Sequence, residues 1–113
     1  MSRDARLRLA DIASACERIA RYVEGASANA LETDELRLDG VVRNLEVIGE
    51  AVKALPPDLL ARAPDVDWKR IARMRDYIAH RYFAVDPAIV WSAATAFAPS
   101  LKAAVMRLLA ELD

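Results

Sequence analysis

The residues with the clearest potential for chemistry lie together in one stretch, from Asp67 to Phe83. This stretch contains the only histidine of the chain, His80. Histidine transfers protons near neutral pH, and arginine binds phosphate through two parallel hydrogen bonds. Cleavage of RNA without a metal ion requires a base for the 2′-hydroxyl proton and a cation for the phosphate charge. The stretch supplies cations at Lys69, Arg70, Arg73, Arg75 and Arg81.

Helix geometry limits how these side chains can meet. At about 100° per residue, Arg75 and His80 lie about 140° apart around a helix, whereas Tyr82 lies within about 20° of Arg75. Arg75 and His80 converge if the helix ends near His80, if the arginine reaches around it, or if a second copy of the chain completes the site. Asp76 precedes His80 by four residues, so its carboxylate can bond to the imidazole. This chemistry makes Arg75 and His80 candidate catalytic residues, with Asp76 as a candidate supporting residue.

The same stretch suits contact with RNA, because local positive charge binds phosphates and interleaved aromatic rings stack on bases. We predict that Lys69, Arg73 and Arg81 contact RNA. In the alternative interpretation the basic side chains form a solvated surface and His80 has a capping or structural role. The whole chain has 16 basic and 17 acidic residues, which excludes a protein that binds nucleic acid through overall positive charge.

The rest of the chain is predicted to form the helices that position this stretch. Hydrophobic residues make up 55% of the 113 residues, and only three glycines interrupt the chain, a composition that favours helices. Four segments have apolar residues on one helical face, in three of them at regular spacings of three and four, the pattern of amphipathic helices. We expect one all-α domain over residues 1–113, a four-helix bundle with short extra helical turns. The four stripes are Leu9, Ile12, Cys16, Ile19 and Val23; Leu38, Val41, Leu45, Ile48, Val52 and Leu55; Trp68, Ile71, Ala72 and Ile78; and Val90, Ala94, Phe97, Leu101, Ala104, Leu108 and Leu112.

Residues that begin and end helices separate these segments. Gly25 closes the first helix, and Thr33 is predicted to be the N-cap of the second. Pro56-Pro57 ends the second helix. The third helix is expected from about Asp67 to about His80. Asp86-Pro87 starts the fourth helix as an N-cap followed by proline, and Pro99 is expected to kink that helix.

Several other residues have a structural interpretation. Gly49 lies beside the second stripe, where a missing side chain lets another helix approach closely. Arg43 and Glu50 are interpreted as an interhelix polar pair rather than as catalytic groups. Cys16 lies on the buried stripe and is expected to be a core residue. A single cysteine excludes an internal disulfide, and one cysteine with one histidine gives no zinc cluster, so we expect neither a metal nor a cofactor.

The chain shows no sign of membrane insertion by inspection of its sequence. No apolar run approaches the roughly 18 residues that a membrane span needs. The first residues lead into no signal-peptide core. We therefore expect a cytoplasmic protein without membrane contact. Asp65-Val66-Asp67 is interpreted as helix capping and not as part of a nucleotidyltransferase site, because no glycine-rich phosphate loop accompanies it.

Arg75 to Tyr82 has the form arginine, four residues, histidine, one residue, tyrosine. This form resembles the signature of the HepT-like branch of the HEPN superfamily. The flanking residues agree in order, from Trp68 through Ile89–Trp91. The segment from Arg43 to Ala51 resembles the second-helix block of the same family, so the resemblance covers nearly the whole chain.

The resemblance implies a HEPN helical bundle that works as a two-fold dimer, with the arginine and histidine of both copies lining a shared cleft. It implies a metal-independent ribonuclease, acting on tRNA or mRNA as the toxin of a toxin–antitoxin pair. The implied partner is a minimal nucleotidyltransferase antitoxin that transfers AMP to Tyr82 and silences the toxin. Two alternatives remain, a non-catalytic module that docks a nucleotidyltransferase or presents its substrate, and a purely structural helical dimer. Histidine favours the nuclease, because binding alone does not require it.

Overall fold

The computed structural model of the chain describes residues 3–81 and 84–112, and every regular element within them is helical. This confirms the prediction of an all-α fold. The elements are α1 (Arg3–Val23), α2 (Ala28–Thr33), α3 (Glu35–Lys53), α4 (Pro57–Leu60), α5 (Trp68–His80), α6 (Pro87–Ser92), a π-helical turn η1 (Ala93–Phe97), and α7 (Ala98–Leu112).

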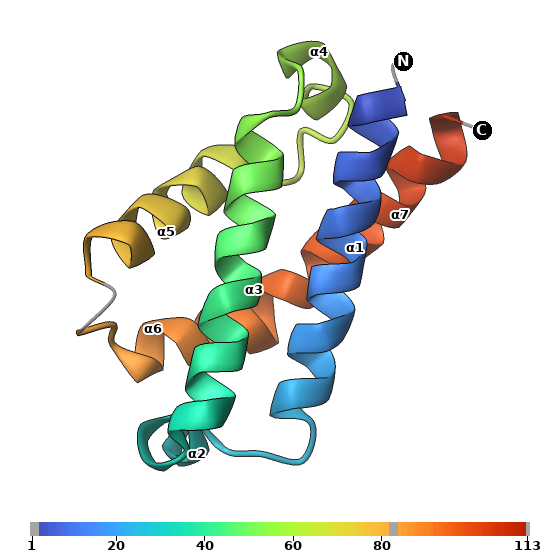
Figure 1. The fold of residues 1–113 in the computed structure, drawn as a ribbon. Helices are drawn as coiled ribbons and strands as arrows, with labels where there is room; N and C mark the ends of the chain where they lie inside the picture. Colours follow the sequence, from blue (N-terminus) through green and yellow to red (C-terminus); the bar gives the residue numbers. More distant parts are fainter. Residues whose placement is uncertain (1–2, 82–83, 113) are drawn as a thin grey trace.

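The long helices pack around one core, with α3 in the middle of the arrangement (Figure 1). Helix α1 packs against both α3 and α7, and α5 packs mainly against α3. The predicted apolar stripes supply this core, because side chains from every stripe are buried within it. Its largest fully buried side chains are Leu9, Ile12, Ile19, Leu31, Leu59, Ile78, Leu101, Leu108, Val41, Val90 and Val105.

Aspartate side chains begin the helices that carry the site. Asp34 accepts a hydrogen bond from the Arg37 backbone N–H at the start of α3, and Asp67 accepts one from the Arg70 N–H at the start of α5. The Asp34 cap corrects the prediction for Thr33, which is the last residue of the short helix α2. A carboxylate at a helix N-terminus also interacts favourably with the helix dipole, which Thr33 would not do.

The chain from Pro87 to Leu112 is one continuous helical stretch, and it contains a π-helical turn where the sequence predicted a kink. Pro99 has no N–H, and its ring excludes the carbonyl of the preceding turn. The wider turn η1 directly precedes it, with the Ala98 N–H donating to the Ala93 carbonyl, five residues back. A π-turn is one of the ways in which a helix accommodates a residue that breaks the regular ladder.

This stretch is 26 residues long and contains an 18-residue window with a mean hydropathy of 1.3. It is therefore long and apolar enough to cross a membrane by length and composition alone, so the expectation that no apolar run approaches this length is wrong. In the fold, Val90, Leu101 and Val105 of the stretch lie in the core. A core helix passes the same test of length and composition, and 39% of the window is buried.

Candidate active site

Helix α5 carries the predicted catalytic residues, and side chains at both of its ends fix its position. At its start the Trp68 indole Nε1 donates to the carbonyls of Leu60 and Ala63, at 3.0 and 3.1 Å. Near its end the Tyr77 hydroxyl accepts a hydrogen bond from the Asp86 N–H at 3.0 Å. The predicted third helix is confirmed, with Asp67 as its N-cap and His80 as its last residue.

Arg75 lies where α5 comes closest to α3. A Cβ atom built on Gly49 would overlap the Cβ and Cγ atoms of Arg75, so the glycine is what permits this approach. The prediction that Gly49 allows a close helix contact is therefore confirmed. The Arg75 guanidinium forms an ion pair with Glu50, and its side chain remains 33% exposed. The aliphatic part of the Arg75 side chain is thus fixed by packing, and its guanidinium remains accessible.

The Asp76 carboxylate belongs to a network between the same two helices. It accepts a hydrogen bond from the Lys53 ammonium at 2.6 Å and lies 3.7 Å from the Arg75 guanidinium. The hydrogen bond from Lys53 and the nearby positive charges of Lys53, Arg75 and His80 lower the pKa of Asp76 below its usual value. The carboxylate therefore stays ionised between the cations.

His80 is held by the backbone and not by the carboxylate of Asp76. Its Nδ1 lies 2.7 Å from the Asp76 carbonyl oxygen, which replaces the predicted bond to the Asp76 side chain. A carbonyl only accepts, so Nδ1 must donate, and the neutral imidazole then has its lone pair on Nε2. His80 is exposed at the end of α5. Its Nε2 is therefore a hydrogen-bond acceptor on an exposed side chain.

Arg75 and His80 do not meet within one chain. Arg75 interacts with Glu50 across the contact with α3, whereas His80 interacts with the backbone of Asp76. No hydrogen bond or ion pair joins the two side chains within the described residues. Helix α5 ends at His80, as one of the three routes to convergence requires, but this does not bring the side chains of Arg75 and His80 together.

The predicted RNA-contacting residues are accessible. Lys69 and Arg73 are exposed on α5, and the exposed Arg81 lies over the Tyr77 ring, 5.6 Å from its centroid. Tyr82, predicted as the modification site, lies outside the described residues. The roles of all these residues stay predictions.

The sequence did not predict the α3 residues that contact Arg75 and Asp76, which are Glu50 and Lys53. The sequence predicts that Glu50 pairs with Arg43, but Glu50 pairs with Arg75. Arg43 is exposed and belongs to no ion pair within the described residues. Lys53 was not considered at all. A usable signal existed, because Glu50 and Lys53 follow Gly49 within the next helical turn, where another helix was expected to approach. Charged side chains beside such a contact are the natural partners of charges on the arriving helix.

The remaining reactive side chain is part of the core. Cys16 is 3% exposed, and burial raises the pKa of its thiol to about 11. This confirms its structural interpretation, because a thiol with so high a pKa forms little thiolate. In residues 3–81 and 84–112, no three His, Cys, Asp or Glu side chains form a group that could hold a metal ion.

Comparison with known proteins identifies relatives over nearly the whole chain. The family model described as "Ribonuclease HepT-like" matches residues 12–108. A protein of Thermococcus cleftensis named "Probable ribonuclease HepT" is 38% identical over 94 residues, which cover 83% of this chain and 86% of that protein. A protein of Caldanaerobacter subterraneus named "Putative RNase" is 38% identical over 101 residues, which cover 89% of this chain and 90% of that protein.

A third relative is longer. A protein of Methanocaldococcus jannaschii named "Gamma-glutamylcyclotransferase and putative RNase" is 32% identical over 113 residues, which cover 100% of this chain and 51% of that protein. The chain thus spans about half the length of this relative. No solved structure gives a significant match to the chain.

Proposed function

The chain belongs to the HepT-like ribonuclease family and has the all-α fold expected of a HEPN domain, and on this premise we propose that it is a metal-independent endoribonuclease that cuts RNA with Arg75 and His80. The observation that carries the proposal is the hydrogen bond from His80 Nδ1 to the Asp76 carbonyl. This bond leaves Nε2 as the proton acceptor of an exposed imidazole at the end of α5. Such a group is what proton abstraction from a ribose hydroxyl needs.

The reaction is a transfer of the phosphodiester to the neighbouring hydroxyl. His80 Nε2 removes the proton of the 2′-hydroxyl, and the 2′-oxygen forms a bond to the adjacent phosphorus. The bond from phosphorus to the 5′-oxygen of the next nucleotide breaks, that oxygen takes a proton from water, and the protonated His80 returns its proton to the solvent. The products are a 2′,3′-cyclic phosphate and a 5′-hydroxyl end. The requirement for a 2′-hydroxyl makes RNA, and not DNA, the substrate.

Arg75 stabilises the negative charge that builds up on the phosphate oxygens. A guanidinium has five N–H donors, so the ion pair with Glu50 leaves donors for the phosphate. Because Arg75 and His80 face different directions on α5, we further propose that two copies of the chain form a two-fold dimer. The arginine of one copy then acts with the histidine of the other at a shared cleft.

The biological role that fits this activity is that of the toxin in a toxin–antitoxin pair, acting in the cytoplasm on tRNA or mRNA. The family resemblance supports a minimal nucleotidyltransferase as the antitoxin. In the proposed silencing step the Tyr82 hydroxyl oxygen attacks the α-phosphorus of ATP, a new phosphodiester bond forms, and pyrophosphate leaves. The added AMP is bulky and anionic, and it would compete with RNA for the cations of the site.

The test is cleavage of total RNA and purified tRNA by the unmodified full chain in the presence of EDTA. We expect cleavage by the native chain, and at least a 100-fold loss in each of His80→Ala and Arg75→Ala, because each removes a group that acts in the transition state. The matched control is Arg43→Ala, which removes an exposed arginine of α3 that forms no ion pair with the site. This control should cut RNA at the native rate.

Mass spectrometry of the same samples completes the test by showing whether Tyr82 carries AMP. If unmodified native protein leaves RNA intact, the nuclease proposal fails, and a non-catalytic module that docks a nucleotidyltransferase becomes the better description. RNA binding that is unchanged in His80→Ala would then support that module. Cleavage that persists in both variants would instead move the active site to other residues.

A further inference from the structure

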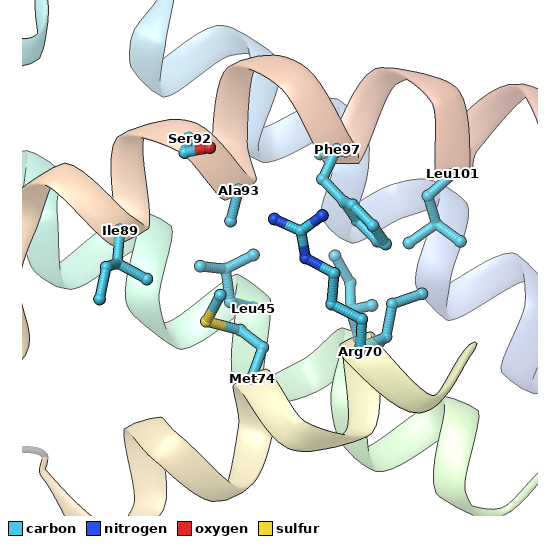
Figure 2. A pocket seen from close by; sticks show the side chains of 11 residues that line it. Leu45, Arg70, Met74, Ile89, Ser92, Ala93, Phe97 and Leu101 are labelled. Atoms are coloured by element: carbon cyan, nitrogen blue, oxygen red, sulfur yellow. The ribbon is translucent and has the colours of Figure 1, made fainter. Parts of the chain in front are cut away.

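An apolar pocket opens between α5 and the helical stretch formed by α6, η1 and α7 (Figure 2). Helix α5 packs mainly against α3. The pocket has a volume of about 150 Å³. Leu45 and Ile48 of α3 form part of its wall, and Ile71 and Met74 of α5 form another part. The remaining wall includes the π-turn, a geometry frequent at functional sites.

One cationic side chain lies in this apolar pocket. Figure 2 shows the Arg70 guanidinium extending from α5 toward the opposite wall, between Ala93 and Phe97. Its central carbon lies 5.2 Å from the centroid of the Phe97 ring, a cation–π contact. The Ser92 hydroxyl adds a polar group to the lining. The pocket lining therefore combines apolar side chains, an aromatic ring and the hydrogen-bond donors of Arg70 and Ser92.

The surroundings of the pocket determine which ligand fits best. The exposed cations Lys69 and Arg73 lie within one turn of Arg70 on α5, so the helix that forms this wall of the pocket also carries positive charge. Flat rings on a negatively charged chain match both the apolar interior and the basic surroundings, and single-stranded nucleic acid has this combination.

We propose that this pocket binds one unstacked pyrimidine base of the RNA substrate. The proposal rests on the proposed function, since it assigns a base-binding subsite to the same RNA. The ring enters between Met74 and Phe97, and the Arg70 guanidinium covers it or donates hydrogen bonds to its carbonyl oxygen. A cavity of about 150 Å³ lined by apolar side chains is large enough to accept a benzene-sized ring. A single-ring base therefore fits, whereas a purine would extend beyond the pocket.

The test uses the native full chain and cytidine 5′-monophosphate as the probe, with ribose 5-phosphate as the matched probe that lacks a base. Methionine methyl groups labelled with ¹³C report on binding, because Met74 lines the pocket and Met106 is 48% exposed on α7. We expect a saturable shift of the Met74 methyl resonance with the cytidine nucleotide, caused by the ring current of the base. The Met106 methyl should not move, and ribose 5-phosphate should not shift Met74.

Variants then connect the shift to the pocket. Phe97→Leu keeps an apolar side chain but removes the aromatic face, and Arg70→Gln removes the charge. Base stacking is strong enough that each variant should weaken nucleotide binding about 5- to 100-fold. Arg43→Gln removes an exposed cation of α3 that does not line the pocket, and it should leave binding within twofold of native.

Three outcomes would overturn the proposal. The first is an equal Met74 shift with ribose 5-phosphate, which would mean that only the phosphate binds. The second is no Met74 shift at any nucleotide concentration. The third is a Met74 shift that follows protein concentration without nucleotide, which would mean that another copy of the chain occupies the pocket. None of these readouts depends on RNA cleavage, so a failure of the nuclease proposal is observed separately.

Discussion

At the scale of single residues, the accessible cation of the site is already engaged before any substrate arrives. The Arg75 guanidinium is paired with Glu50 and lies near Asp76, so two carboxylates surround it. These ion pairs are partly exposed and contribute little to folding, about 1 kcal/mol or less each. Their effect is better understood as geometric, because they fix the direction in which the remaining N–H donors point. We infer that Glu50 is a positioning residue for Arg75.

Replacing Glu50 by alanine should therefore lower the rate of RNA cleavage more than it lowers stability. We expect kcat/KM to fall about 10- to 100-fold, because a displacement of about 1 Å in a catalytic group has an effect of this size. The free energy of unfolding should change by no more than about 1 kcal/mol. Cleavage kinetics and urea denaturation of the same preparation measure the two effects.

The control for this variant is Glu46→Ala, which removes the same charge one turn earlier on α3. A double variant gives the sharper result, since in an Arg75→Ala background the loss of Glu50 should have no further effect on cleavage. Faster cleavage or tighter RNA binding in Glu50→Ala would contradict the positioning role, because it would mean that Glu50 competes with the phosphate.

At the scale of the helices, the crossing of α3 and α5 depends on one missing side chain. Gly49 lies directly under the stem of Arg75, and no other residue type leaves room for that stem. Gly40, also on α3, is less critical, since a Cβ atom there would lie 3.1 Å from the edge of the Tyr22 ring. Alanine substitutions at Gly40 and Gly49 therefore share the same gain in helix propensity and differ in the cost of packing.

Gly49→Ala should destabilise the protein and reduce its activity. Alanine gains about 1 kcal/mol over glycine in a helix, but forcing α5 outward costs about 1–3 kcal/mol. We expect a net loss of about 1 kcal/mol, read by urea denaturation, and at least a tenfold loss of RNA cleavage as Arg75 moves. Gly40→Ala should keep native cleavage, and an equal loss in the two variants would argue against a specific role for the Gly49 contact.

The elements that carry strong local signals were predictable from the sequence. Asp67 and Asp86 are aspartates directly before apolar periodic segments, and both cap helices as expected. The left-handed cap at Gly25 also follows from local preference, and its φ is 72°. The core faces follow from periodicity, because burial of an amphipathic face leaves few other arrangements.

The features that the sequence did not predict depend on contacts between distant residues. The short helix α2 and the turn η1 have no periodic pattern long enough to detect. The buried Asn44 accepts a hydrogen bond from Arg18 at 2.7 Å, a contact between α1 and α3 that neither segment reveals alone. Within the site, the types and spacing of Arg75 and His80 were informative, but their partners came from α3 and from the backbone.

At the scale of the whole molecule, the core contains the Cys16 thiol, whose pKa differs between the folded and the unfolded chain. The pKa of the Cys16 thiol is about 11 in the folded chain, against an ordinary value of 9.0. The unfolded chain therefore loses this proton at lower pH than the folded chain does. Stability is unaffected by this group below about pH 9 and decreases as the pH rises from 9 toward 11.

We expect this decrease to amount to about 2–3 kcal/mol at its limit, since one pKa unit corresponds to 1.36 kcal/mol. Urea denaturation of native protein and Cys16→Ala between pH 8 and pH 11 measures it. The variant should be less stable at pH 8 because of the smaller side chain, and its stability should depend less steeply on pH. Parallel curves for the two proteins would contradict the assignment.

Alkylation gives an independent check on the same feature. In native buffer at pH 8, iodoacetamide should leave Cys16 unmodified, and in urea above the unfolding midpoint the thiol should react completely. Rapid reaction of the folded protein would mean that the region around Cys16 opens without global unfolding.

Helix α1 packs against both α3 and α7, and α7 is synthesised long after α1. A ribosome makes α1, α3 and α5 before α7, and the contact between Gly49 and Arg75 does not involve α7. Helix α1 can therefore pack against α3 before it can pack against α7. Until α7 arrives, the apolar side of α1 that faces it stays uncovered, which is the period when the nascent chain is most exposed to aggregation and to chaperones.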